Sequence, residues 1–183
     1  LFAEEATDVI LEKLGHPPRP SITGERPLPG AEAPPDFVRL AREIPLPPAA
    51  LERIWRRLGS RIRSVLGDAA PADLAPICRS EAVTAAEIRY AVEVEGCRTL
   101  EDLRRHTHLG AGSCDGADCA APAAQLLARL AGWPPERTRA ELDAFLQNRW
   151  VGRRPVLTGA TLAHEELVRG IYDPPAPSLP PRA

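Results

Sequence analysis

Apolar residues recur along most of this chain with the three- and four-residue spacing of amphipathic α-helices. No stretch alternates between apolar and polar residues with a period of two over the length of a strand. The sequence therefore predicts an all-α fold without a β-strand. The expected helices cover residues 1–14, 36–44, 48–58, 62–66, 85–95, 100–107, 126–130, 135–150 and 162–171.

Two helix-start signals predict a helical hairpin in the middle of the chain. Thr84 with Glu87, and Thr99 with Asp102, have the spacing of a capping box. In this motif the first side chain accepts a hydrogen bond from the backbone N–H three residues later, and the side chain of that later residue accepts one from the backbone N–H of the first. Gly96 lies between the two boxes and is placed to end the first helix. We therefore expect a small helical domain built around a central hairpin.

Proline divides the chain into segments. The 183 residues include 21 prolines, and these cluster between the expected helices instead of spreading evenly. The chain contains no methionine and begins within a helical pattern, so we expect it to be the C-terminal part of a longer protein. The expected segments are a terminal helix of an upstream domain at 1–15, a proline-rich linker at 16–35, a helical connector at 36–70, a cysteine-containing domain at 71–132, C-terminal helices at 133–172 and a disordered tail at 173–183.

Three cysteines lie in the two turn-rich loops that bracket the hairpin. Cys78 precedes it, and Cys114 and Cys119 follow it in a loop rich in glycine. Because a hairpin brings its ends together, we expect the three thiols to meet. Such a set suits an iron–sulfur cluster or a structural zinc. Ser80 stands where a fourth cysteine would complete a C-x-C pair, and a serine hydroxyl is harder and far less acidic than a thiol.

Other interpretations of these residues remain open. Free cysteines pack well as small apolar side chains, so the three thiols could simply be buried. Zinc is the rival metal, although one C-x4-C loop without a nearby histidine is a weak zinc pattern. Cys97, at the interhelix turn, is expected to pack in the core. His106 and His108 are two residues apart on a helix, so they face different ways and make a poor chelating pair.

Charge and motifs exclude several classes of function. The formal net charge is −2, which does not favour a nucleic-acid or anionic-membrane surface. The second helix of the hairpin places Glu101 and Asp102 where a recognition helix would meet phosphates, so we expect no nucleic-acid partner. No catalytic triad, HExxH, P-loop or dinucleotide fingerprint is present, and we expect no catalytic residue. A basic face of Arg98, Arg104 and Arg105 is expected to be solvated.

The segment from residue 77 to residue 130 resembles a known family. It follows the pattern C-x-C-E-x-V-T, a hairpin, and then G-x-G-x-C-x-G-x-x-C, with Ser80 in place of the second cysteine. This pattern is similar to the bacterioferritin-associated-ferredoxin-like [2Fe-2S] domain in the C-terminal region of FAD-dependent glycerol-3-phosphate dehydrogenase of the anaerobic type. AEEATDVILEKLG near the start, FLQNRWVGRRPVL and GIYD extend the resemblance to about Asp173.

The resemblance implies what the chain belongs to. The FAD fingerprint and the substrate-binding residues of the family would lie upstream of Leu1, so this segment is expected neither to bind FAD nor to be catalytic by itself. The family oxidises glycerol 3-phosphate to dihydroxyacetone phosphate and passes electrons to quinone. The implied partners are the chain's own FAD domain and iron–sulfur or membrane-anchor subunits. The implied location is the cytoplasm or the inner face of the cell membrane.

Two functions are therefore compared below. In the first, Cys78, Cys114 and Cys119, with Ser80 as a doubtful fourth ligand, hold a [2Fe-2S] cluster that relays electrons. In the second, the segment is a structural helical module of a flavin oxidoreductase whose iron–sulfur site has been lost.

Overall fold

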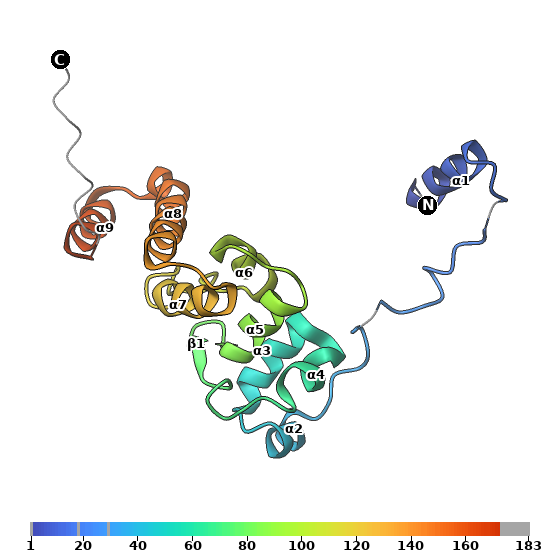
Figure 1. Cartoon of the computed structure of the whole chain (residues 1–183), viewed down its shortest axis with the longest axis horizontal. Helices are drawn as coiled ribbons and strands as arrows, with labels where there is room; N and C mark the ends of the chain where they lie inside the picture. Colours follow the sequence, from blue (N-terminus) through green and yellow to red (C-terminus); the bar gives the residue numbers. More distant parts are fainter. Residues whose placement is uncertain (1, 18, 29, 173–183) are drawn as a thin grey trace. The chain divides into compact units, whose positions relative to one another are not determined.

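The computed structural model describes residues 2–17, 19–28 and 30–172, with the side chains of 168–172 excepted. The chain divides into two compact units, Leu1–Ala69 and Ala70–Ala183 (Figure 1). The proline-rich tail expected at 173–183 lies outside the described residues. Helices dominate both units, as the sequence predicted.

The first unit contains four α-helices among its described residues. They are α1 (Phe2–Lys13), α2 (Phe37–Glu43), α3 (Pro48–Leu58) and α4 (Ile62–Leu66), with a short 3₁₀ turn, η1 (Gly59–Arg61), before α4. The Asp36 side chain caps α2 by accepting hydrogen bonds from two backbone N–H groups. Helices α2 and α3 pack against each other. Their buried residues are Leu40, Leu51, Ile54 and Leu58.

Helix α1 differs from its neighbours because it buries none of its residues. Phe2 is 84% exposed and Ile10 is 56% exposed, although both are large apolar side chains of the helix expected at 1–14. An amphipathic helix of this length gains most of its stability by packing that face against something. Docking of α1 on an upstream domain stays a prediction.

The second unit contains the helical hairpin and the helices that cover it. Its helices are α5 (Ala85–Glu93), α6 (Leu100–Thr107), α7 (Ala120–Ala131), α8 (Pro135–Arg153) and α9 (Gly159–Tyr172), with a 3₁₀ turn, η2 (Arg154–Val156), before α9. The core lies where α5 packs on α6 and α7 and where α7 packs on α8. Its fully buried side chains include Ile88, Leu100, Leu103, Leu109 and Leu127.

The expectation that the chain has no strand was wrong. Strands β1 (Pro76–Cys78) and β2 (Val83–Thr84) pair antiparallel just before α5, with Cys78 opposite Val83. Two strands of three and two residues are too short to show an alternating pattern in the sequence. The gap between the helices expected at 135–150 and 162–171 is also more helical than predicted, because α8 continues to Arg153 and α9 begins at Gly159.

Both predicted capping boxes are present. The Thr84 hydroxyl accepts a hydrogen bond from the Glu87 N–H at 3.3 Å, and the Glu87 carboxylate accepts from the Thr84 N–H at 3.0 Å. Thr99 and Asp102 make the same pair of bonds at the start of α6. The first box is buried, with Thr84 1% and Glu87 2% exposed. It therefore fixes the start of α5 within the core. None of the helices in the described part of the chain is both long and apolar enough to span a membrane.

Replacing Thr84 by alanine should destabilise the second unit by about 1–2 kcal/mol, since an N-cap hydroxyl is lost and the buried Glu87 carboxylate loses a partner. Urea unfolding followed by circular dichroism measures this loss. Thr138→Ala is the matched control, because its hydroxyl bonds the Pro134 carbonyl on an exposed surface. Equal losses in the two variants would contradict the structural role of the buried box.

Candidate metal centre

The two cysteine loops lie at the starts of two helices that pack together. The first loop connects β1 to β2 and leads directly into α5. The second loop, residues 108–119, connects α6 to α7, and Cys119 is the residue immediately before α7. Because α5 packs against α7, the loops at their N-terminal ends meet. The hairpin geometry expected from the sequence thus produces one common pocket.

Cys78, Cys114 and Cys119 converge in this pocket. The Cys78 and Cys114 sulfurs are 3.7 Å apart, as are those of Cys114 and Cys119, and all three lie within 4.8 Å of one another. Cys78 and Cys119 are fully buried, whereas Cys114 is half-buried. Cys97 does not belong to this group and packs in the hydrophobic core. Burial raises the pKa of its thiol.

Ser80 occupies the fourth corner of the pocket. Its hydroxyl donates a hydrogen bond to the Cys114 sulfur at 3.1 Å and lies 3.4 Å from the Cys78 sulfur. The side chain is therefore directed at the thiols, as expected for a residue at the second position of the C-x-C pattern. Its chemistry is that of a hydroxyl beside the sulfurs of Cys78 and Cys114.

The pocket stabilises negative charge on the sulfur of Cys78 but not on that of Cys119. Hydrogen bonding with Cys119 lowers the pKa of Cys78 to about 4, against the effect of burial, and Ser80 and the backbone N–H groups of Gly110 and Glu81 lower it further. The interaction with Cys78, together with burial, raises the pKa of Cys119. Backbone N–H groups directed at sulfur are typical of thiolate and cluster-binding loops.

Two glycines allow the second loop to approach its neighbours. A Cβ atom on Gly112 would lie 2.7 Å from the Ser80 hydroxyl oxygen and 2.6 Å from a carboxylate oxygen of Glu81. Gly116 has a φ of +88°, and a Cβ there would lie 2.9 Å from the Phe145 ring. The spacing of these glycines was part of the sequence pattern, and the structure gives the physical reason for it.

An ionic network around Asp115 was not found by sequence reasoning. The Asp115 carboxylate pairs with the guanidinium groups of Arg149 and Arg153, both on α8, and the second pair is 2.8 Å long. Arg153 also pairs with Glu165 of α9 at 2.9 Å. The contacts of Asp115 join residues more than 30 positions apart, so no local sequence signal could reveal them.

One basic residue of the hairpin is less solvated than expected. Arg98 and Arg105 are exposed, although Arg98 also donates hydrogen bonds to the carbonyls of Val92 and Cys97. Arg104 is only 31% exposed and pairs with Glu101 on the same helix. The expected solvated face therefore holds for Arg98 and Arg105 but not for Arg104.

The two histidines of the hairpin are not ligands of the thiol group. The Nδ1 atom of His106 lies 2.8 Å from a Glu95 carboxylate oxygen. His108 is the left-handed residue that ends α6. Neither belongs to the only metal-type cluster found within the described side chains, which consists of the three cysteines.

The thiol pocket opens to solvent through a hollow of about 650 Å³. A metal ion or cluster could enter from this side. The hollow is lined by Pro76, Ile77, Arg79, Ser80, Ser113, Cys114, Asp118 and Cys119.

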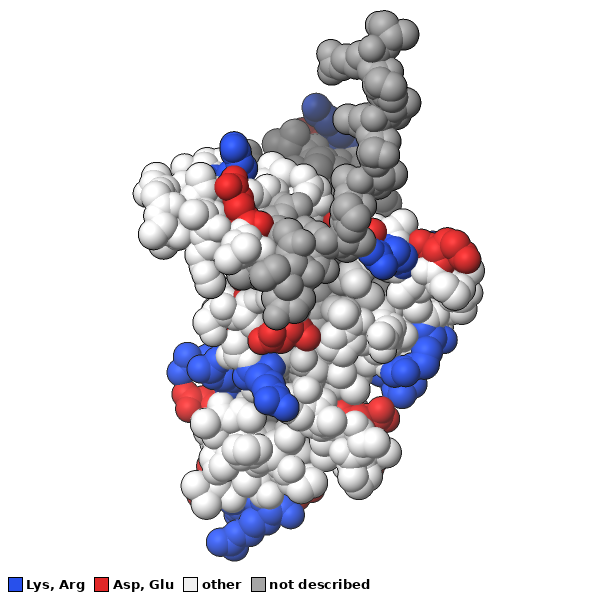
Figure 2. Space-filling model, turned by 90° about the vertical axis from the view of Figure 1, so that its left-hand side faces the viewer, with Lys and Arg blue, Asp and Glu red and all other residues white. Residues whose placement is uncertain are grey.

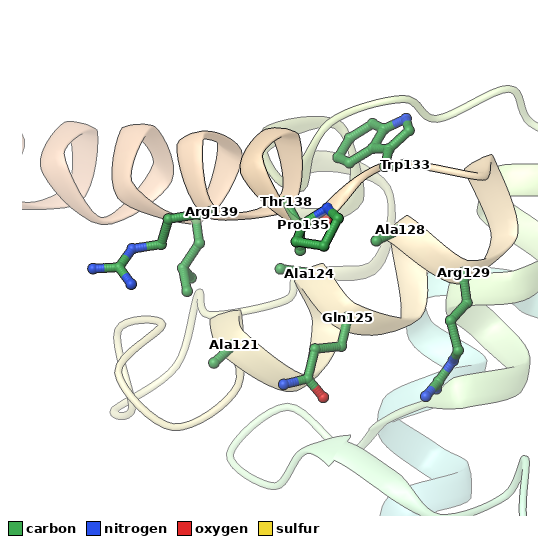
Figure 3. A pocket seen from close by; sticks show the side chains of 10 residues that line it. Ala121, Ala124, Gln125, Ala128, Arg129, Trp133, Pro135, Thr138 and Arg139 are labelled. Atoms are coloured by element: carbon green, nitrogen blue, oxygen red, sulfur yellow. The ribbon is translucent and has the colours of Figure 1, made fainter.

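A second hollow, of about 450 Å³, lies between α7 and α8 (Figure 3). Small and apolar residues such as Ala124, Ala128 and Trp133 line most of it, and no cysteine, histidine or carboxylate is among its described lining residues. On the face shown in Figure 2, basic and acidic side chains are interspersed. The thiol pocket is thus where the described residues concentrate their metal-binding groups.

The fold and the site together define a helical domain that carries a three-cysteine pocket between two loops. The model of one family, described as the C-terminal domain of alpha-glycerophosphate oxidase, matches residues 21–138. This chain belongs to that family.

Several relatives carry related names. One subunit of the anaerobic glycerol-3-phosphate dehydrogenase of Escherichia coli K12 is 38% identical over 180 residues, which cover 94% of this chain and 31% of the relative. The subunit of the same name from Haemophilus influenzae is 35% identical over 172 residues, covering 94% and 30%. Glycerol-3-phosphate dehydrogenase 2 of Mycobacterium tuberculosis H37Rv is 31% identical over 156 residues, covering 81% and 26%.

The chain spans about a third or less of the length of these relatives. No solved structure gives a significant match. The resemblance to the C-terminal region of the anaerobic glycerol-3-phosphate dehydrogenase, expected from the sequence motifs, is confirmed.

Gly116→Ala should destabilise the second unit by about 1–3 kcal/mol, because a side chain there requires a disfavoured backbone conformation and meets the Phe145 ring. Gly152→Ala is the matched control: Gly152 lies within α8, and a Cβ there would meet nothing within 4 Å. Alanine at 152 should stabilise the helix by about 0.5–1 kcal/mol. Urea denaturation of the two variants measures both shifts, and a neutral Gly116→Ala would refute the close packing of the loop on α8.

Proposed function

We propose that this chain is the C-terminal part of an FAD-dependent glycerol-3-phosphate dehydrogenase and that its thiol pocket holds a [2Fe-2S] cluster as an electron relay. The names of its relatives support the enzyme class. In this proposal an upstream domain binds FAD and oxidises glycerol 3-phosphate to dihydroxyacetone phosphate, and the electrons continue to quinone. The cluster, when bound, accepts and passes on single electrons.

The convergence of three thiols carries the proposal. Cys78, Cys114 and Cys119 would be three ligands of the cluster, and Ser80 would supply the fourth corner. The three sulfurs lie at mutual distances that one metal centre can bridge, and backbone N–H groups already stabilise charge on Cys78. The residues of this chain would orient the ligands and, by burying two of them, limit access of water.

A second candidate function is a structural helical module whose metal site has been lost. One observation favours it: the pocket is satisfied without a metal. The three thiols and Ser80 hydrogen-bond one another, so no sulfur of the pocket needs an ion to complete its contacts. A zinc ion bound by the same three thiolates is a variant of the first proposal that supplies no electron transfer.

The proposal includes partners and a location. The exposed apolar stripe of α1 would dock on the FAD domain of the same protein. Because the relatives are named as one subunit of a larger enzyme, further iron–sulfur and membrane-anchor subunits fit the proposal. The location would be the cytoplasm or the inner face of the cell membrane. No nucleic-acid partner is proposed.

Anaerobic reconstitution with iron and sulfide tests the cluster. A bound [2Fe-2S] cluster gives visible absorption and about two irons per chain, whereas zinc gives neither. Cys114→Ala should abolish the absorption, and Cys97→Ala, which removes a thiol outside the group, should leave it unchanged. Full-length protein without absorption or bound iron would instead support the structural module.

Ser80→Cys should raise cluster occupancy, because a thiolate is available near neutral pH whereas a serine hydroxyl must lose a much less acidic proton to ligate. Iron content after reconstitution measures the gain. Ser113→Cys is the control, since it adds a thiol at the rim of the hollow instead of the fourth corner. If the wild-type protein already holds its full complement of iron and Ser80→Cys adds nothing, serine or another group is a competent fourth ligand.

A further inference from the structure

One face of α8 contacts two successive residues of the second cysteine loop, Asp115 and Gly116. The Phe145 ring closes on Gly116, and the Arg149 guanidinium pairs with Asp115. Arg153 pairs with the same carboxylate. Phe145, Arg149 and Arg153 are spaced four residues apart, so they form a single stripe along the helix. The loop between Cys114 and Cys119 is therefore held by one row of side chains.

The loop residue that this row holds has an unfavourable backbone conformation. Asp115 has a φ of +45°, in the left-handed region, which is unfavourable for a residue with a side chain even though aspartate adopts it more often than most. Such a conformation persists only where surrounding contacts impose it. The ion pairs with α8 are suitable contacts, because the Asp115 side chain is only 18% exposed and Arg149 only 20% exposed. A pair shielded to this degree is screened by solvent much less than a surface pair.

Arg149 also lies in the electrostatic field of the thiol group. Burial lowers the pKa of Arg149, as do the neighbouring guanidinium groups of Arg104 and Arg153, whereas Glu101 and the Cys114 sulfur raise it. Its Nε atom is buried and, among the described residues, has no hydrogen-bond partner. The Arg149 guanidinium thus interacts electrostatically with charged groups of α6 and α8 and with the Cys114 sulfur.

We propose that Arg149 is a positioning residue for the thiol pocket: by holding Asp115 it fixes the loop that presents Cys114 and Cys119, and its charge offsets that of the bound thiolates. The first half of this inference, the positioning of the loop, does not depend on a cluster. The second half, the effect of the Arg149 charge on the thiolates, rests on the cluster proposed above. The match of the family model ends at residue 138, before any of the three α8 residues.

The first half is tested by hydrogen exchange on the metal-free, full-length protein. Arg149→Met should speed the exchange of the backbone amides of residues 112–118 at least tenfold, while amides in the middle of α5 keep the wild-type rate. Arg139→Met is the matched control, because Arg139 lies on the same helix and pairs with Asp143 at 3.1 Å on the exposed surface. Arg149→Lys keeps the charge but not the planar fork, so it should restore protection in part.

The second half is tested on reconstituted protein. Loss of the positive charge disfavours the more negative, reduced cluster, so Arg149→Met should shift the reduction potential to a more negative value and hasten iron loss to a chelator. Arg149→Lys should return the potential most of the way to the wild-type value, and Arg139→Met should not move it. A role confined to packing would leave the potential unchanged.

The outcomes separate this inference from the proposed function. Wild-type exchange at residues 112–118 in Arg149→Met would overturn the positioning role, whether or not a cluster binds. If Arg149→Met also lowers protection from hydrogen exchange throughout α5, the Arg149→Lys variant becomes the deciding measurement. Wild-type protection of residues 112–118 in Arg149→Lys would show that the geometry of the Arg149–Asp115 pair is dispensable. If the wild-type protein binds no iron, the proposed cluster fails, and hydrogen exchange still decides the role of Arg149.

Discussion

The packing of α5 against α7 is the contact on which the site depends. Each of these helices begins directly after a cysteine loop, so burying their apolar faces against each other brings the two loops together. The driving force is ordinary hydrophobic burial by residues such as Ile88, Ala123 and Leu127. A pocket of three thiols thereby forms at the helix starts without a disulfide between these described cysteines.

The buried capping box at the start of α5 makes this arrangement specific. A polar pair in the core is tolerated only if its hydrogen bonds are made, and Thr84 and Glu87 satisfy each other. The pair sets the residue at which α5 begins, and Thr84 is itself the last residue of β2, the strand in which Val83 pairs with Cys78. The start of α5, the register of the β1–β2 pair and the position of the Cys78 thiol are therefore all set by the same few residues.

Local signals predicted the helices and the thiol cluster but not what holds the cluster in place. Capping boxes, apolar spacing and glycine positions act within a few residues, and they sufficed to predict the hairpin and the meeting of Cys78 with Cys114. The two short strands give no periodic signal. The pairing of Asp115 with Arg149 depends on how α8 folds back over the loop, which is a property of tertiary packing.

In the proposed function, Ser80 would influence whether the metal-free or the metal-bound state of the pocket is favoured. In the metal-free fold its hydroxyl completes a network in which every sulfur of the pocket has a hydrogen-bond partner, so none of these described sulfurs is left unsatisfied. A metal ion would have to replace these hydrogen bonds with metal–sulfur bonds and gain a weaker ligand at the fourth corner. Cysteine at this corner would favour the bound state, whereas serine brings the two states closer in free energy. The groups that hold the loop, Asp115 and α8, therefore bear directly on which state is occupied, because a rigid loop loses less entropy when the metal binds.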